Sequence, residues 1–313
     1  MTVPRILARL SAVAALASVV VFGATALLPS DAVDARTGGR ATAAEQDRLR
    51  AELGLDRPVW RRYADWVTGL ARGDAGRSLL TGRPVGDVVA ERLPATLTLA
   101  GAAMALTVPL TVALAWLLGA TAGRRSRAAR PVGGLVTVAA ALPQVVLAAL
   151  LVTVFAGLLR ALPPVSLLPA GGSPLDDPAL LVLPALTLAI PSAAYGATML
   201  GGAVADTLRR PHVAAAVARG VPARQVAARH VLPFLLAPAL RIFALLAGGT
   251  LAATAVVETF FGYAGLGELL AGAVASRDVP VVQAIALAAT GVVLAGFLAA
   301  DLAAALTDEE RPC

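Results

Sequence analysis

Side chains that could do chemistry are few in this chain of 313 residues. All 26 basic residues are arginines, so the chain lacks the lysine that a P-loop nucleotide site or a pyridoxal Schiff base requires. The single cysteine, Cys313, excludes an internal disulfide and a cysteine cluster around a metal or an iron–sulfur centre. The two histidines, His212 and His230, are too few for the usual zinc sites. We therefore predict no catalytic residues, no metal site and no cofactor bound by this chain itself.

The composition is that of a membrane protein. Hydrophobic residues make up 58% of the chain and charged residues 15%, with a mean hydropathy of +0.78, whereas a soluble domain has about 25% charged residues. A helix needs about 20 apolar residues to cross a bilayer, and prolines are tolerated inside it. Such windows predict an all-α integral membrane protein with six transmembrane helices, at residues 6–28, 93–119, 132–159, 179–204, 231–257 and 280–306.

The arginines are distributed unevenly between the short connections of these helices. Eleven lie in the N-terminus and in the second-to-third and fourth-to-fifth connections, whereas only Arg160 and Arg277 lie in short connections on the other side. Because arginine is enriched in cytoplasmic loops, both termini are predicted to be cytoplasmic. The same topology accounts for the net charge of +6, and we predict no nucleic-acid partner. A cleaved signal peptide is the alternative for the first apolar run, but the length of that run favours an uncleaved anchor.

A large external segment is predicted between the first and second helices. It includes an amphipathic stretch at residues 53–70, with Trp60, Tyr63 and Trp66 at helical spacing. Such aromatic residues anchor a helix at the membrane interface or fill a small core, and contact with an external partner protein is the alternative. The predicted organisation is an N-terminal helix with its external segment (1–92), a transmembrane domain (93–307) and a short cytoplasmic tail (308–313).

We call the connection at residues 205–232 the knob. Its residue pattern predicts a helix–turn–helix on the cytoplasmic face. Pro211 can start a helix, and Gly220 followed by Pro222 can end it in a tight turn. A second short helix is predicted from Pro222 to His230. The knob is therefore expected to be compact and exposed.

The knob resembles the EAA motif of ABC-transporter permease subunits, in which an alanine pair is followed by a glycine and then by Leu-Pro. Ala214 stands where the motif has its glutamate. The resemblance implies that the helix containing Val213 is a coupling helix, which docks in a groove of an ATPase subunit. The residues that match the motif are Ala215, Ala216, Gly220, Leu232 and Pro233.

Further stretches resemble the dipeptide/oligopeptide/nickel permeases in the same order along the chain, at residues 53–58, 73–78, 81–85, 91–96, 183–189, 257–267 and 277–283. This resemblance implies one permease subunit of an ATP-driven importer in the bacterial cytoplasmic membrane, for peptides or a related small solute. The implied partners are a second homologous permease, two ABC ATPases that hold Mg-ATP, an extracytoplasmic solute-binding protein and the lipid bilayer.

Two other functional classes compete with this interpretation. An ion-coupled secondary carrier would work without ATPases, but it would need ionisable residues near the membrane midplane, and the predicted helices have few. An intramembrane enzyme would need a catalytic pair or a metal cluster within the helices, and the sequence offers neither.

An acidic residue near the external end of the fifth helix is a candidate site. Glu258 comes just before a glycine-rich turn that contains Gly262, Gly265 and Gly267. The functional interpretation is an external gate or a contact for the binding protein. The structural alternative is a solvated or helix-capping carboxylate.

Other polar residues lie inside the apolar segments. Arg241 lies well inside the fifth segment, and a charge at that depth snorkels, faces the bundle interior or pairs. We predict an ion pair between Arg241 and Asp301. Gln144, Tyr195 and Thr198 are candidates for lining a pathway, with hydrogen bonds to neighbouring helices as the alternative.

Overall fold

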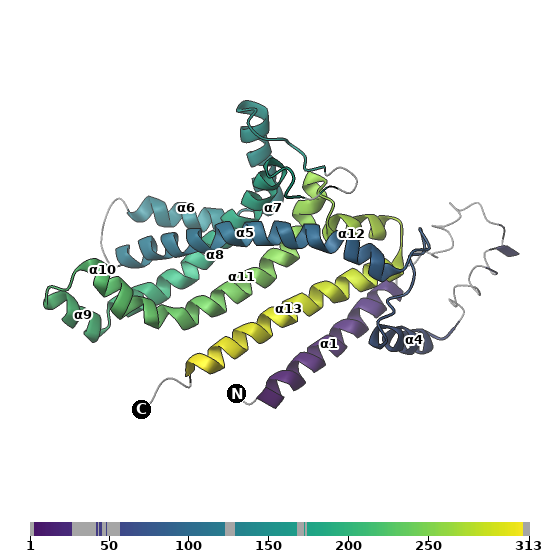
Figure 1. Cartoon of the computed structure of the whole chain (residues 1–313), viewed down its shortest axis with the longest axis horizontal. Coiled ribbons are helices and arrows are strands. Elements are labelled where there is room, and N and C mark those ends of the chain that lie inside the picture. The colour runs from purple at the N-terminus through teal and green to yellow at the C-terminus, as the bar shows by residue number, and fades with distance from the viewer. Residues whose placement is uncertain are drawn as a thin grey trace.

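The structure is a computed structural model that describes residues 3–26, 57–122, 129–167 and 174–308, together with a few isolated positions at 42–48 and at 172. Within this part of the chain every regular element is a helix, and the only strand-like pairing is an isolated antiparallel bridge between Arg77 and Pro84. Long helices lie side by side along the molecule (Figure 1). They are α1 (Val3–Ala26), α5 (Val85–Thr121), α6 (Ala129–Ala141), α8 (Ala179–Leu208), α11 (Leu232–Phe261) and α13 (Val279–Asp308).

The centre of the bundle is α8, which packs against α5 and α11. In its most apolar stretch 61% of the residues are buried, against 22% in α5 and in the helix that contains α11. Small residues allow the close approach. A Cβ atom on Gly119 of α5 would come within 2.5 Å of the Val204 side chain, and one on Gly196 would come within 2.7 Å of Leu246. The alanine and glycine content of the sequence therefore sets how closely these helices pack.

The predicted third transmembrane helix is not one straight helix. α6 is followed by α7 (Gln144–Leu151) and the π-helical η1 (Val152–Leu158), and the two halves are bent by 107°. The bend falls at Pro143, which has no backbone N–H and disfavours a helical conformation in the residue before it. As a result η1 projects away from the other helices (Figure 1), whereas α7 stays packed against the bundle through its buried Leu147, Ala148 and Leu151.

The described residues contain four helices that are long and apolar enough to cross a membrane, or five if the bent pair forms one span. α1 adds a shorter apolar stretch, Ser11–Ala26, within a helix of 24 residues. The four long helices coincide with the predicted second, fourth, fifth and sixth segments. The total of six crossings remains a prediction.

The external segment contributes one amphipathic helix, α4 (Val59–Ala71), which packs on α1. The rings of Tyr63 and Trp66 lie 5.3 and 5.5 Å from that of Phe22, and the Tyr63 hydroxyl lies 2.8 Å from that of Ser18. Tyr63 and Trp66 are half-buried against α1, whereas Trp60 is 65% exposed, and α4 has no fully buried residue. Residues 53–56 of the predicted stretch lie outside the described residues.

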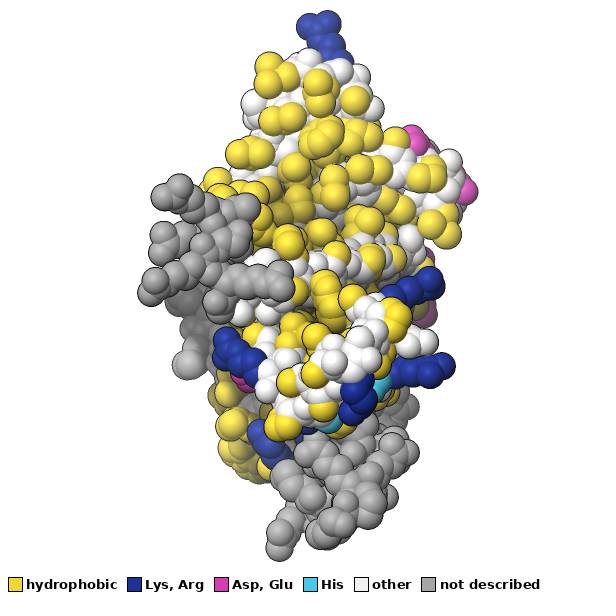
Figure 2. Space-filling model, turned by 90° about the vertical axis from the view of Figure 1, so that its left-hand side faces the viewer, with side chains coloured by type: hydrophobic (Ala, Val, Ile, Leu, Met, Phe, Trp, Pro, Cys, Tyr) yellow, Lys and Arg dark blue, Asp and Glu magenta, His cyan; other side chains and the backbone are white. Residues whose placement is uncertain are grey.

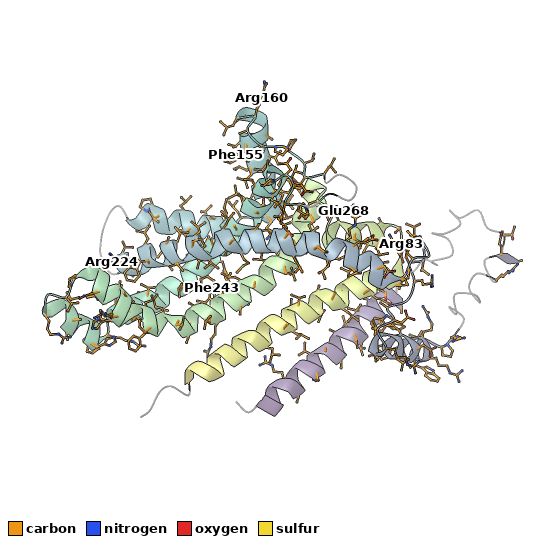
Figure 3. The ribbon with its side chains drawn as sticks, in the orientation of Figure 1. Arg83, Phe155, Arg160, Arg224, Phe243 and Glu268 are labelled. Atoms are coloured by element: carbon orange, nitrogen blue, oxygen red, sulfur yellow. The ribbon has the colours of Figure 1, made fainter. Side chains whose placement is uncertain are left out.

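The two ends of the bundle differ. The start of α1 and the end of α13 lie toward the same end as α9 (Pro211–Ala218) and α10 (Ala223–Gln225), whereas α4 and α12 (Leu266–Ala275) lie at the other end (Figure 1). Figure 3 likewise places Arg224 at the end opposite Arg83 and Glu268. The predicted knob is therefore at one end of the molecule and the predicted external turn at the other.

Candidate functional site

The knob has the predicted helix–turn–helix form. Pro211 is the first residue of α9, and Gly220 follows the helix with a left-handed φ of +77°, which a residue with a Cβ atom rarely adopts. The N–H of Val221 then donates to the carbonyl of Ala216 at 3.2 Å. The second helix is not a separate short one, because α10 continues through the π-helical η2 (Val226–Val231) into α11, giving one helix of 39 residues.

The knob has an apolar core of its own. Val213 and Ala216 of α9 are 2% and 0% exposed and belong to a cluster with Val226, Val231 and Leu235. The resemblance placed Ala216 in the motif and Val213 in the same implied coupling helix, and both side chains pack α9 against the base of the knob. α9 is therefore a fixed element and not a loose loop.

The remaining motif residues lie on the outside. Ala215 is exposed, Leu232 is 60% exposed, and Pro233 is exposed in the first turn of α11. The alanine pair is thus divided, since Ala216 packs inward and Ala215 faces away from the core. The outward residues are the ones available for contact with another protein.

The two histidines brace the base of the knob. His212 Nε2 lies 3.1 Å from the carbonyl oxygen of His230, and the His212 ring lies 4.8 Å from the ring of Phe234. The Arg210 guanidinium lies 5.1 Å from the centre of the same Phe234 ring. The His212 ring therefore packs between α9 and α11, and no group of three or more potential metal-binding side chains occurs in the described part of the chain.

The four residues proposed as an external gate form one packed turn. Gly262 ends α11 with a left-handed φ of +64°, and the N–H of Tyr263 donates to the Glu258 carbonyl at 2.9 Å. The Glu258 side chain is fully buried, and its Oε2 accepts a 2.5 Å hydrogen bond from the N–H of Gly267. The alternative of a solvated carboxylate is therefore wrong, because the turn folds back over the carboxyl group.

Glycine is required at two positions of this turn by close contacts. A Cβ atom on Gly265 would overlap the Glu258 carboxyl group, and one on Gly267 would overlap the backbone of Ala255 in α11. The turn is also tied to α5, because the Tyr263 hydroxyl donates to the Ala95 carbonyl at 2.8 Å. Burial raises the pKa of the Tyr263 phenol, so this donor stays protonated. Whether the turn moves as a gate remains a prediction.

Sequence reasoning missed a second buried polar cluster at this end. The Ser78 hydroxyl donates to the Asp278 carboxylate, whose Oδ1 also accepts from the N–H of Leu79 at 2.9 Å. Nearby, the Gln283 side chain donates to the Thr25 hydroxyl at 2.7 Å. Ser78, Asp278 and Gln283 all lie in stretches that carry the family resemblance, which was the available signal. The cluster joins α1 and the external segment to the start of α13.

The pathway candidates separate into one that lines a groove and two that do not. Tyr195 is 47% exposed and borders a groove of about 280 Å³ between α8 and α11, beside Ser192 and Thr250. Thr198 donates to the Tyr195 carbonyl at 2.7 Å and so is satisfied within its own helix. Gln144 is half-buried at the start of α7, outside this groove.

The predicted ion pair between α11 and α13 remains a prediction. Arg241 is exposed on α11, which packs against α13. Asp301 falls within α13, but its side chain lies outside the described residues.

These features define a helical membrane protein with an exposed, braced knob at one end. Residues 93–310 match the family model described as the inner membrane component of binding-protein-dependent transport systems, and residues 2–100 match its N-terminal companion model. The chain belongs to this family. The resemblance predicted from its motifs is confirmed, and the chain is a multi-pass permease subunit of an ABC importer in the cytoplasmic membrane.

Several relatives are similar along most of their length. A Brucella abortus (strain 2308) protein with the provisional name of peptide transport system permease protein is 34% identical over 263 residues, which cover 82% of this chain and 81% of the relative. The glutathione transport system permease protein GsiC of Escherichia coli (strain K12) is 31% identical over 270 residues, covering 85% and 84%. A peptide ABC transporter permease of Sinorhizobium fredii (strain NBRC 101917 / NGR234), also provisionally named, is 28% identical over 305 residues, covering 95% and 94%.

Proposed function

We propose that this chain pairs with a second, homologous permease to form the path by which a peptide enters the cell. A binding protein would deliver the peptide at the end that carries α4 and α12, and two ABC ATPases would dock at the knob. The names of the relatives, which refer to peptide and glutathione transport, support the substrate class. The observation that carries the proposal is α9, a rigid helix that is packed on its own core and exposed at one end of the bundle.

The test is purification of the tagged chain from its native membrane in a mild detergent, followed by mass spectrometry of the proteins that remain bound. We expect an ABC ATPase and a second permease in stoichiometric amounts. Mass spectrometry of the solute held by the system's binding protein would then identify the substrate, and a peptide is expected. Solute uptake by the chain alone in proteoliposomes, driven by an ion gradient without ATPase, would instead support the ion-coupled carrier.

The proposed topology has six crossings, with the knob and both termini in the cytoplasm. Because Cys313 is the only cysteine of the chain, a membrane-impermeant maleimide reports the side on which the C-terminus lies. We expect labelling in inside-out vesicles and none in right-side-out vesicles. A Cys313→Ser variant is the control for background labelling, and the reverse pattern would contradict the orientation.

The groove beside Tyr195 is proposed to border the translocation path. Its lining includes the hydroxyls of Ser192, Tyr195 and Thr250 but no charged side chain, which suits a peptide backbone that needs hydrogen-bond partners in transit. In an uptake assay of the assembled transporter, Tyr195→Ala should lower peptide uptake about three- to tenfold. A decrease of this size corresponds to the loss of one or two hydrogen bonds or contacts. Met199→Ala, one turn along α8 at a side chain that is 43% exposed and outside the groove, is the matched control. Equal uptake by both variants would remove the groove from the path.

A further inference from the structure

Beyond Asp206, its one exposed acidic residue at the end of α8, the surface of the knob carries positive charge only. Five arginines lie in it, and the chain has no aspartate or glutamate between Asp206 and Glu258. Figure 2 shows that end of the molecule, with dark-blue arginine side chains around the yellow and white surface of the knob. All five are exposed: Arg209, Arg210, Arg219, Arg224 and Arg229.

The ion pairs in the described part of the chain lie elsewhere. They join Arg57 to Asp65, Arg83 to Glu91 and Arg92 to Glu268, all at the end of the molecule that holds α4, the start of α5 and α12. Within the residues that the structure describes, the knob arginines have no carboxylate partner. The Arg210 guanidinium stacks on the Phe234 ring, and the charge of the other four arginines is available to another molecule.

The arginines surround a surface of small apolar side chains. Ala214, Ala215 and Ala218 are exposed on α9, and Val217 is 60% exposed. Such a surface lets the backbone of α9 approach a partner closely, and the buried Val213 and Ala216 keep the helix from shifting. The knob thus presents an apolar surface of small side chains with a cationic border.

We propose that α9 docks in an ATPase groove that has an apolar floor and an acidic rim, with ion pairs that run from permease arginine to ATPase carboxylate. This inference rests on the proposed function, which supplies the ATPase. Ala214 occupies the position of the motif's glutamate, so α9 offers no carboxylate of its own. The polarity of the contact follows, because an acidic rim complements the exposed arginines.

A membrane surface is the other partner that arginines attract, and the shape of α9 argues against it. Helices that lie in a lipid interface insert bulky apolar side chains such as Trp, Phe and Leu. The exposed apolar side chains of α9 include three alanines and one valine, and these side chains are too short to insert into the lipid and anchor the helix. These small side chains fit a groove between protein elements better.

The test measures binding of the co-purified ATPase to the full-length permease in nanodiscs of phosphatidylcholine. Binding is measured at 50 and at 300 mM NaCl, between which the Debye length falls about 2.5-fold. We expect the wild-type Kd to rise about tenfold over this range, since border charges act through screened attraction. The double variant Arg219→Gln/Arg224→Gln should bind about five- to tenfold more weakly at low salt and show a smaller salt dependence. Arg72→Gln, at an exposed arginine next to α4, is the matched control and should bind like the wild type.

The charge-conserving double variant Arg219→Lys/Arg224→Lys should retain the affinity and the salt dependence, because the attraction needs charge and not the guanidinium shape. Unchanged affinity and salt dependence in the glutamine variant would overturn the proposal. If the glutamine variant binds the ATPase like the wild type but no longer binds phosphatidylglycerol vesicles, the proposal is overturned in favour of a membrane contact. A wild-type chain that binds the ATPase independently of salt refutes this inference alone, whereas a wild-type chain that binds no ATPase refutes the proposed function as well.

Discussion

Replacing Gly220 by valine should separate ATP hydrolysis from transport. Gly220 turns the chain from α9 to α10 at φ +77°, where an L-residue costs roughly 1–2 kcal/mol and a β-branched one is a strong outlier. No atom lies within 4 Å of a Cβ at this position, so the strain is in the backbone and is relieved by tilting α9 away from its core. Because about 1.4 kcal/mol corresponds to a factor of ten, we expect peptide uptake to fall about tenfold or more.

The measurement is ATP-dependent uptake and ATP hydrolysis by the reconstituted transporter. The ATPases should still hydrolyse ATP, because their active sites are not in this chain. Gly220→Asn is the matched control, since asparagine tolerates the left-handed conformation, and it should retain most of the uptake. Normal uptake by the valine variant, although α9 is displaced, would contradict the coupling role of the knob.

The second large effect is expected at the glycine-rich turn after α11, where Gly267→Ala should destabilise the folded protein. A Cβ atom at Gly267 would overlap the backbone of Ala255, and its next contact is the Ala255 carbonyl carbon at 2.9 Å. Backbone atoms cannot rotate out of the way, so α12 must move off α11. That movement also removes the hydrogen bond from the Gly267 N–H to the buried Glu258 carboxylate. Overpacking of this kind costs about 1–3 kcal/mol, and leaving the buried acceptor without a donor adds about 1–3 kcal/mol.

Thermal unfolding of the purified permease in detergent measures this effect. A loss of about 3 kcal/mol lowers Tm by roughly 5–10 °C in a chain of this size. Gly272→Ala is the control on the same helix, because a Cβ there meets nothing within 4 Å, and alanine in a helix interior is favoured by about 0.5–1 kcal/mol. The two glycine-to-alanine changes should therefore have opposite signs. A Gly267→Ala protein as stable as the wild type would show that α12 does not pack on α11 in this way.

Most of the helices followed from the sequence. Hydropathy and helix length are local properties, and the predicted second, fourth, fifth and sixth segments coincide with helices long enough to span a membrane. The turn at Gly220 and the helix start at Pro211 were likewise predictable, since each depends on the backbone preference of one residue. The third segment was predicted as one helix because its apolar composition continues through Pro143. Composition alone does not show that the helix axis bends sharply at this proline.

The sites were only partly predictable. The motifs drew attention to the stretches near Glu258 and in the knob, because residue type and spacing are visible in the sequence. Spacing could not show that Glu258 is fully buried, or that Ala216 faces the core of the knob while Ala215 faces outward. Those properties depend on which helices pack together.

The sequence by itself determined the class of protein, the positions of most helices and the all-arginine positive charge of the knob, because these depend on residue type and on neighbours along the chain. The tertiary structure alone decided which residues meet across long separations. Ser78 and Asp278 are 200 residues apart in sequence but share a buried hydrogen bond, and Tyr263 reaches the Ala95 carbonyl. The physical reason is that burial and long-range hydrogen bonds depend on which helix surfaces pack against each other, and this packing forms only when the bundle assembles.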